Sequence, residues 1–321
     1  MIRRELLLAA LALPMPGHAA SPGNIARQLA ESYPATASPG YVGALIGAAQ
    51  RRLGLKPNRP APPATLPDEW PQRAGYAAFA EAARDDGDEA ARLLALQALR
   101  ASIVDTPQGP RVAGLRAWTD DLFMPTLLFD RALPLLPAAE RLRAAEALNA
   151  SLLALAERLQ RADGLFNHAV GSPVAWGRGN GFAALALTQA LTGPLPDSPA
   201  LLARLQVHLQ AVLPLQRDDG LWRQVLDHAG AAPELTVTAM NLAALVTARR
   251  QGWLPASSLD DAIGRAWTGV QSRFDADGGL RDVCAGTPAG PTLDFYLQRP
   301  MVNGRDERAA AMVLLAALSV A

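Results

Sequence analysis

Two adjacent carboxylates, Asp120 and Asp121, stand between an indole and an apolar run that extends from Leu122 to Leu128. Ionised side chains lose their hydration in apolar surroundings, so these two acids need a chemical or a structural reason to be there. A carboxyl group in an apolar, aromatic setting can serve as a general acid and then as a general base. We assign that chemistry to Asp120, which lies beside Trp118, and a supporting role to Asp121 and Met124.

The same stretch also fits a purely structural role at the start of a helix. Thr119 would be the N-cap, the two Asp side chains would complement the positive end of the helix dipole, and Pro125 would fit the first turn. The residues alone leave both interpretations open.

A second polar stretch contains His168, Trp176, Arg178 and Asn180. Three glycines surround the Arg and the Asn, and we expect a helix to begin at about Gly181. Such a backbone can approach a ligand closely, and a guanidinium offers a planar fork to a carboxylate. The glycine pattern matches neither a P-loop nor a dinucleotide-binding fingerprint. A single histidine is also common as a structural residue, so that alternative stays open for His168.

A third stretch follows Asp219 and includes Trp222, Gln224 and Glu234. The indole and the amide could face a sugar, because aromatic rings stack on sugar faces. Glu234 precedes a hydroxyl-bearing helix start, which could cap that helix or bind a ligand. Structural roles are the alternative for each of these residues.

The elements that must position these side chains are helices. Apolar residues recur at every third or fourth position, as in Leu201, Leu205, Leu209 and Leu213, and no run alternates with period two. A first helical region covers residues 22–49, and a connector from Pro57 to Pro71 carries six prolines that prevent regular helix. Further helices are expected at residues 75–84, 88–104, 143–161, 181–191, 199–215, 235–251, 258–274 and from 308 to the end of the chain.

An Asp-Gly step recurs between these helices. Asp163, Asp219 and Asp277 each precede a glycine and lie 56 and 58 residues apart, which is the length of two helices with their connections. The glycine would end a helix in the left-handed conformation, and the next leucine would re-enter the core. About twelve helices of ordinary length fill the chain. The sequence therefore predicts an all-α fold, an (α/α)6 toroid or barrel of repeated helical hairpins, with its site where the loops converge at one mouth.

The composition excludes several classes of partner. The formal net charge is zero, so the basic excess expected for nucleic-acid or anionic-membrane binding is missing, and no later segment is long and apolar enough for a membrane span. Cys284 is the only cysteine, which rules out an intramolecular disulfide and a cysteine metal cluster. The histidines show no metal-ligand spacing. We expect no metal and no cofactor.

The N-terminus has the pattern of an export signal. Arg3 and Arg4 precede an apolar run, Leu6 to Leu13, and Gly17-His18-Ala19 is a small-x-small cleavage site. We expect a signal peptide at residues 1–20, a single catalytic domain at residues 21–321, and export to the bacterial periplasm or the medium. The arginine pair loosely matches a twin-arginine signal.

Five motifs in order resemble the unsaturated uronyl hydrolases of glycoside hydrolase families 88 and 105, which include the unsaturated glucuronyl and rhamnogalacturonyl hydrolases. The resemblance runs from about Trp70 to the C-terminus. The motifs are Trp-x-Asp-Asp-Leu-Phe-Met at 118–124, Gly-Leu-Phe-x-His at 164–168, Trp-Gly-Arg-Gly-Asn-Gly at 176–181, Asp-Gly-Leu-Trp-x-Gln-Val-Leu-Asp at 219–227 and Glu-x-Thr-x-Thr-Ala-Met at 234–240.

This resemblance implies an (α/α)6 barrel and a metal-free hydration reaction on the 4,5-unsaturated uronic acid that polysaccharide lyases leave at the end of an oligosaccharide. Asp120 matches the catalytic position of the family. His168, Trp176 and Arg178 match positions that line the unsaturated sugar, with the guanidinium as a partner for its carboxylate. Trp118, Asn180 and Trp222 are further candidate sugar contacts, and Glu234 is a candidate supporting residue.

The chain departs from the family pattern at two places. Only seven residues separate His168 from Trp176, where family members carry a longer loop, and neither Asp68 nor Glu69 aligns clearly with a second essential Asp. Two other functions therefore stay open: a conventional glycosidase that pairs Asp120 or Asp121 with Glu234 on saturated glycosides, and a carbohydrate-binding relative without catalysis.

Overall fold

The computed structural model describes residues 21–34, 40–57, 61–62, 64–194 and 198–321, and most of these residues are helical. The predicted signal peptide, residues 1–20, lies outside the described residues. Among the described helices, none combines the length and the apolar character that crossing a membrane requires.

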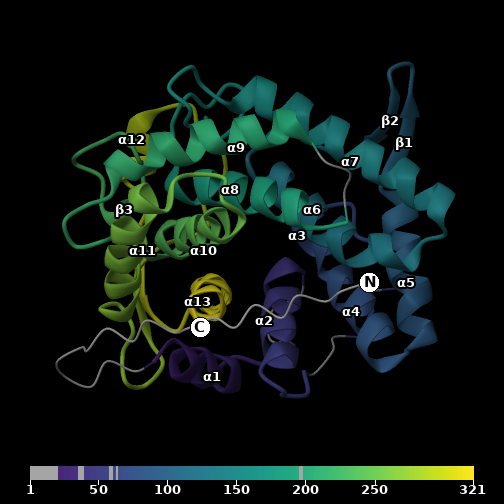
Figure 1. Cartoon of the computed structure of the whole chain (residues 1–321), viewed down its shortest axis with the longest axis horizontal. Helices are drawn as coiled ribbons and strands as arrows, with labels where there is room; N and C mark the ends of the chain where they lie inside the picture. The colour runs from purple at the N-terminus through teal and green to yellow at the C-terminus, as the bar shows by residue number, and fades with distance from the viewer. Residues whose placement is uncertain (1–20, 35–39, 58–60, 63, 195–197) are drawn as a thin grey trace.

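A closed ring of inner helices forms the centre of the molecule (Figure 1). Each inner helix packs against the next one along the chain, and the last packs against the first, so the two ends of the chain close the ring. The inner helices are α2 (Tyr41–Arg52), α4 (Ala77–Asp86), α6 (Asp120–Ala132), α8 (Gly177–Thr192), α10 (Leu235–Gln251) and α13 (Glu307–Val320). This closed ring confirms the predicted toroid of helical hairpins.

A second layer of helices surrounds the ring. Its members are α1 (Pro22–Ser32), α5 (Glu89–Ala101), α7 (Ala138–Leu159), α9 (Pro199–Val212) and α11 (Ala256–Gln271). Between α2 and α4 the described residues form no long outer helix, and the proline-rich connector runs there instead. The expected count of twelve long helices is therefore wrong by one in the described residues, because proline lacks the N–H that a helix interior needs.

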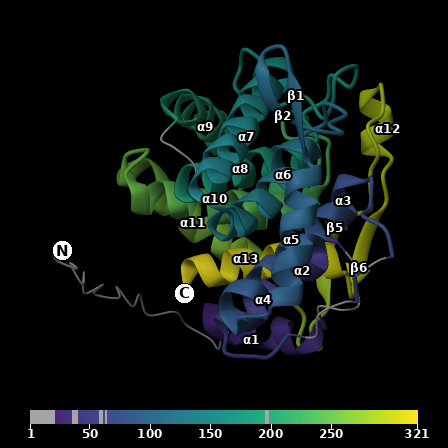
Figure 2. The same cartoon turned by 90° about the vertical axis from the view of Figure 1, so that its right-hand side faces the viewer.

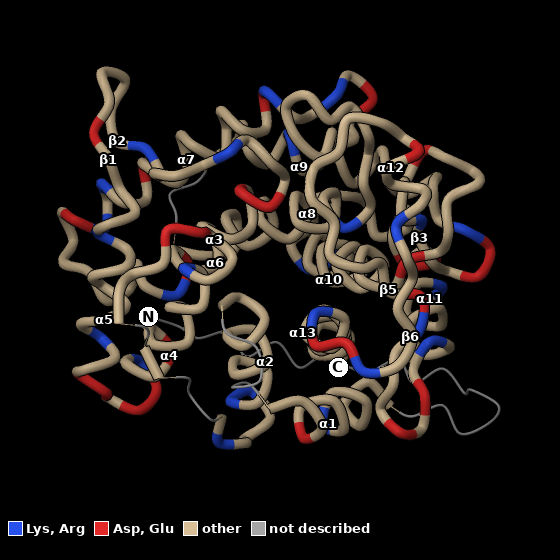
Figure 3. Tube along the Cα trace, turned by 180° about the vertical axis from the view of Figure 1, so that it is seen from behind, with Lys and Arg blue, Asp and Glu red and all other residues tan. Residues whose placement is uncertain are grey.

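The inner helices α8 and α10 are apolar on almost all sides, which is why they occupy the centre. In α8 the only charged residue is Arg178, and α10 carries its charges in its last turn, at Arg249 and Arg250. Figure 3 shows that the charged residues gather on the outer helices and loops. The core is therefore a layer of Ala, Leu and aromatic side chains on both sides of the inner ring.

No period-two pattern predicts a strand, but the described residues contain three short antiparallel pairs. They are β1 (Ile103–Thr106) with β2 (Gly109–Val112), β3 (Trp222–Arg223) with β4 (Pro233–Glu234), and β5 (Leu280–Cys284) with β6 (Met301–Gly304). Short helices lie at α3 (Trp70–Arg73) and α12 (Leu293–Leu297). Figure 2 shows α3, α12, β5 and β6 on the same side of the ring. These strand pairs are short and lie in the segments that connect helices, so the all-α fold class is confirmed.

The Asp-Gly steps form the same turn three times. Gly164, Gly220 and Gly278 have φ angles of 90°, 82° and 83°. In each turn the Asp side chain accepts a hydrogen bond from the backbone N–H two residues later, at 3.1, 3.2 and 2.9 Å. The leucines at 165, 221 and 280 are buried, as predicted. Each turn follows an outer helix and leads to the N-terminus of an inner helix, so the turns mark one end of the ring.

Gly220 tests the packing of this turn. A Cβ at Gly220 would lie 2.0 Å from the carbonyl oxygen of Arg265 in α11, whereas one at Gly252, which has a φ of 68°, would meet nothing within 4 Å. Both alanine variants pay the cost of a left-handed residue, about 1–2 kcal/mol. We expect Gly220→Ala to lose about 1–3 kcal/mol more than Gly252→Ala, through the clash alone. Urea unfolding of the two variants measures the difference, and equal losses would show that the turn does not pack tightly on α11.

Candidate active site

The N-terminal ends of the inner helices converge at the end of the ring that the Asp-Gly turns mark. Asp120 is the first residue of α6, Arg178 is the second of α8, and Glu234 is the N-cap of α10. Tyr41, the first residue of α2, places its ring 6.4 Å from the Phe123 ring and 6.0 Å from the Phe182 ring. The fold therefore brings residues from four separate parts of the sequence to one place.

Asp120 and His168 face each other there. The Oδ2 atom of Asp120 lies 3.5 Å from Nε2 of His168, and neither buried atom has a hydrogen-bond partner among the described residues. The imidazole is fully buried, while 26% of the Asp120 side chain is exposed. Asp120 is therefore a carboxyl group that solvent or a ligand can reach on one side and that meets a titratable ring on the other.

Aromatic rings surround the histidine. The ring centroid of His168 lies 5.6 Å from that of Trp118 and 4.3 Å from that of Trp176. The backbone N–H of Thr119 donates to the His168 carbonyl oxygen at 2.9 Å, which ties the start of α6 to the histidine segment. Trp118, Asp120, His168 and Trp176, four of the residues singled out in the sequence, are thus in one continuous cluster.

Asp121 has a different role from Asp120. Its Oδ2 atom accepts backbone N–H bonds from Arg116 at 2.7 Å and from Trp118 at 3.0 Å, and burial raises the pKa of its carboxyl group. Asp121 therefore holds the turn that carries Trp118. Met124 is buried in the core.

Two details of the helix-start interpretation are wrong. Thr119 is the N-cap of α6, but its side chain makes no capping bond. Pro125 lies inside α6 rather than in its first turn, so it removes one hydrogen bond from the interior of the helix.

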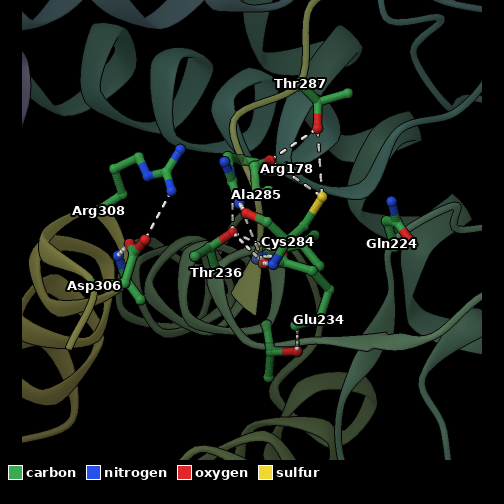
Figure 4. A network of polar contacts seen from close by, with 12 residues as sticks. Arg178, Gln224, Glu234, Thr236, Cys284, Ala285, Thr287, Asp306 and Arg308 are labelled. Carbon is green, nitrogen blue, oxygen red and sulfur yellow. Dashed lines mark hydrogen bonds and ion pairs between the residues drawn. The ribbon is translucent and has the colours of Figure 1, made fainter. Parts of the chain in front are cut away.

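Arg178 is buried in a polar network rather than exposed at the surface (Figure 4). Its Nε donates to Thr236 Oγ1 at 3.0 Å, an Nη donates to the Cys284 carbonyl oxygen, and the nearest oxygen of Glu234 lies 3.6 Å away. The guanidinium also lies 5.4 Å from the centre of the Trp176 ring, within cation–π range. Arg178 therefore joins the start of α8 to α10 and β5. Its guanidinium also packs against the Trp176 ring.

Glu234 completes this network and is fully buried. Its carboxylate accepts bonds from the N–H of Val237 at 2.7 Å, from the N–H of Cys284 at 3.0 Å and from the hydroxyl of Thr236. Every oxygen of the group is in use, so the supporting role expected for Glu234 has a physical basis in the structure.

Asn180 and Trp222 are not sugar contacts in this structure, which corrects the prediction. Asn180 is fully buried, and its amide bonds to both backbone groups of Phe166 and to the carbonyl oxygen of Trp176. Trp222 is also fully buried and donates its indole N–H to the Val212 carbonyl oxygen at 2.7 Å. Both side chains have their polar atoms satisfied by backbone, so neither is available to a ligand.

The glycines of the second stretch also differ from expectation. Helix α8 begins at Gly177, not at about Gly181. A Cβ at Gly177, Gly179 or Gly181 would come within 2.4 to 2.9 Å of Arg223, Thr119 or Met240, respectively. These glycines therefore allow α8 to pack closely against its protein neighbours, where the sequence suggested a close approach to a ligand.

Asp68 and Glu69 are engaged in ion pairs at the surface, with Arg73 and Arg116, and neither forms a described contact with Asp120.

Two tyrosines that the sequence did not single out do reach the site. Burial raises the pKa of Tyr41 to about 12, against the opposing charge of Arg178. The hydroxyl of Tyr296, in α12, lies 2.6 Å from Nδ1 of His168. Neither tyrosine lies in one of the five motifs, because Tyr41 and Tyr296 are far in the sequence from Asp120 and His168.

The described residues contain no group of three or more His, Cys, Asp or Glu side chains arranged to hold a metal ion. Asp120 and His168 are the titratable groups that face each other at the site, beside the rings of Trp118 and Trp176.

Comparison with known proteins places this geometry in a family. The model of Glycosyl Hydrolase Family 88 matches residues 110–321. Protein Atu3128 of Agrobacterium fabrum is 30% identical to the chain, over 41% of this chain and 66% of that protein. The unsaturated rhamnogalacturonyl hydrolase YesR of Bacillus subtilis is 30% identical over 42% of this chain and 37% of its own length. The matched part thus spans less than two thirds of each of these relatives.

The fold is shared over almost the whole chain with solved structures. One, described as a possible member of the GH105 family from Klebsiella pneumoniae, superposes with a TM-score of 0.77 at 17% identity, over 97% of this chain and 96% of that one. At that identity the likeness speaks for the fold, an (α/α)6 toroid. The family model covers well over half of the sequence and includes Asp120, His168, Trp176 and Arg178. The chain therefore belongs to glycosyl hydrolase family 88, a family of glycoside hydrolases.

Proposed function

We propose that this protein hydrolyses oligosaccharides ending in a 4,5-unsaturated uronic acid, by hydration of the enol-ether double bond. The observation that carries the proposal is the single uncommitted carboxyl group of the site. Asp120 is partly exposed and faces His168, whereas Asp121 bonds to backbone N–H groups and Glu234 is buried within its network. Hydration of an enol ether needs one group that is an acid and then a base, which matches this arrangement.

In the first step Asp120 transfers its proton to C4 of the sugar. The C4–H bond forms from the electrons of the double bond, and positive charge develops on C5 and the ring oxygen. In the second step the Asp120 carboxylate takes a proton from a water molecule as its oxygen bonds to C5. The resulting hemiketal opens to a ketone at C5, and the hemiacetal at C1 then releases the rest of the oligosaccharide. The carboxyl group ends in its original protonation state.

We assign the half-buried Trp118 to the sugar, as a ring beside His168, whereas the buried Trp176 packs against His168 and holds it in place. Arg178 is bonded to the protein and paired with the buried Glu234, so we assign it a supporting task, which is to hold Trp176 in place. The name of the Bacillus subtilis relative, an unsaturated rhamnogalacturonyl hydrolase, supports the same class of substrate.

Asp120→Asn tests the acid/base assignment. The amide has nearly the same shape but cannot deliver a proton, so we expect kcat on lyase-generated oligosaccharides to fall by about 10²–10⁴-fold with the fold intact. Loss of the ultraviolet absorbance of the enol ether measures the rate. Asp218→Asn, an exposed carboxylate in the turn before Gly220, is the matched control and should retain full activity.

Full activity of Asp120→Asn would overturn the role of Asp120. Turnover of saturated glycosides but not of unsaturated ones would instead favour a conventional glycosidase, and calorimetric binding of oligosaccharides without turnover would favour a binding protein.

Glu234→Gln separates a structural role of Glu234 from a catalytic one. The change leaves the Arg178 guanidinium buried without its counter-charge, and breaking a buried pair in this way costs about 3–5 kcal/mol. We expect that loss in chemical unfolding, whereas Glu89→Gln, which breaks an exposed pair with Arg92, should change little. A Glu234→Gln variant with the stability of the wild type and no activity would make Glu234 a second catalytic carboxylate.

A further inference from the structure

A buried chain of hydrogen bonds leads away from His168 on the side opposite Asp120. Nδ1 of His168 lies 2.6 Å from the Tyr296 hydroxyl, which lies 2.6 Å from Oγ of Ser172. Ser172 in turn donates to the Gly290 carbonyl oxygen at 2.6 Å, and the Gly290 N–H donates to the Tyr296 oxygen at 3.0 Å. All three side chains are almost fully buried, so water does not compete for these bonds.

The direction of each bond follows from counting hydrogens. A serine hydroxyl has one hydrogen, and a carbonyl oxygen can only accept, so the Ser172 hydrogen points to Gly290. The hydrogen between Ser172 and Tyr296 must then come from the tyrosine. With that hydrogen used, the Tyr296 oxygen has one lone pair for the Gly290 N–H and one left, so it accepts from His168. Burial also raises the pKa of Tyr296, which keeps its hydroxyl protonated.

We propose that Ser172 and Tyr296 are positioning residues that fix the hydrogen of neutral His168 on Nδ1 and so turn the lone pair of Nε2 toward Asp120. This inference rests on the proposed function only for its catalytic meaning. A carboxylate and an imidazole lone pair that face each other at 3.5 Å without other partners repel unless one proton lies between them. In that tautomer the lone pair of Nε2 faces the carboxyl group of Asp120, from which the substrate takes its proton in the proposed reaction.

A hydrogen bond and an apolar cluster hold the segment that carries Tyr296 in place. Gln224 donates to the Tyr296 carbonyl oxygen at 2.6 Å, and the ring packs in a small apolar cluster with Val174, Trp176 and Val225. Trp176 thus contacts His168 on one side and belongs to the cluster that holds Tyr296 on the other. A rotation of the Tyr296 side chain would therefore disturb the packing of Trp176, which contacts His168.

The tautomer of His168 tests the proposal without any substrate. In ¹⁵N NMR of histidine-labelled protein, assigned by comparison with His168→Gln, neutral His168 should carry its hydrogen on Nδ1. In Ser172→Ala the Tyr296 hydroxyl loses its acceptor and can donate to Nδ1, so the hydrogen should move to Nε2. In Tyr296→Phe the preference should be lost. We expect kcat to fall about tenfold to a hundredfold in both variants, with KM little changed.

Two matched variants control for the loss of a buried hydroxyl. Ser151→Ala removes a serine that accepts from the Val112 N–H, and Tyr33→Phe removes a tyrosine bonded to the Gly278 carbonyl oxygen, and both should leave kcat and the tautomer unchanged. A hydrogen on Nε2 in the wild type, or on Nδ1 in Ser172→Ala, would overturn the inference. A tautomer that behaves as expected in a protein without activity on unsaturated substrates would keep the inference and contradict the proposed function.

Discussion

The buried pair of Arg178 and Glu234 is the interaction on which the rest of the site depends. Two charges taken out of water are tolerated only when nearly every donor and acceptor is satisfied. Glu234 meets that demand with the N–H groups of Val237 and Cys284 and the Thr236 hydroxyl. Arg178 donates to Thr236 and to the Cys284 carbonyl oxygen, and its guanidinium lies over the Trp176 ring. The pair therefore fixes the starts of α8 and α10 and the end of β5 relative to one another. Trp176, one residue before α8, takes its place against His168 from that arrangement.

The ring explains why such a pair lies at this end of the molecule. Each Asp-Gly turn returns an outer helix to the start of an inner one, so the positive ends of the inner helix dipoles converge. Carboxylates at those ends are favoured, and Glu234 and Asp306 occupy the N-cap positions of α10 and α13. Asp120 stands at the equivalent end of α6, and its Oδ2 atom has no hydrogen-bond partner among the described residues. It is thus the carboxyl group at these helix ends that stays available for chemistry.

The sequence predicted the ring and part of the site for a physical reason. The turns at Asp163, Asp219 and Asp277 are local structures, and their spacing measures one helical hairpin, so the architecture can be read from them. The residue types of Asn180 and Trp222 suit a sugar, so the sequence alone predicts them as contacts. Whether a polar group is free depends on partners such as Val212, which no local pattern reveals. Tyr296 lies 128 residues from His168, and only the folded chain shows that they meet.

The short connection between His168 and Trp176 carries Ser172, which links it to the segment between β5 and β6. Its Ser172 bonds to Tyr296 and to Gly290, both in the segment between β5 and β6. That segment lies against the apolar cluster around Trp176. The environment of His168 is therefore provided by a distant part of the chain rather than by a long loop of its own. These contacts are buried, and Nδ1 of His168 bonds to Tyr296. The imidazole therefore has one nitrogen without a partner, Nε2, and that atom faces Asp120. A single carboxyl group can then act as acid and base, since its proton has a defined place before the reaction and the same place to return to afterwards.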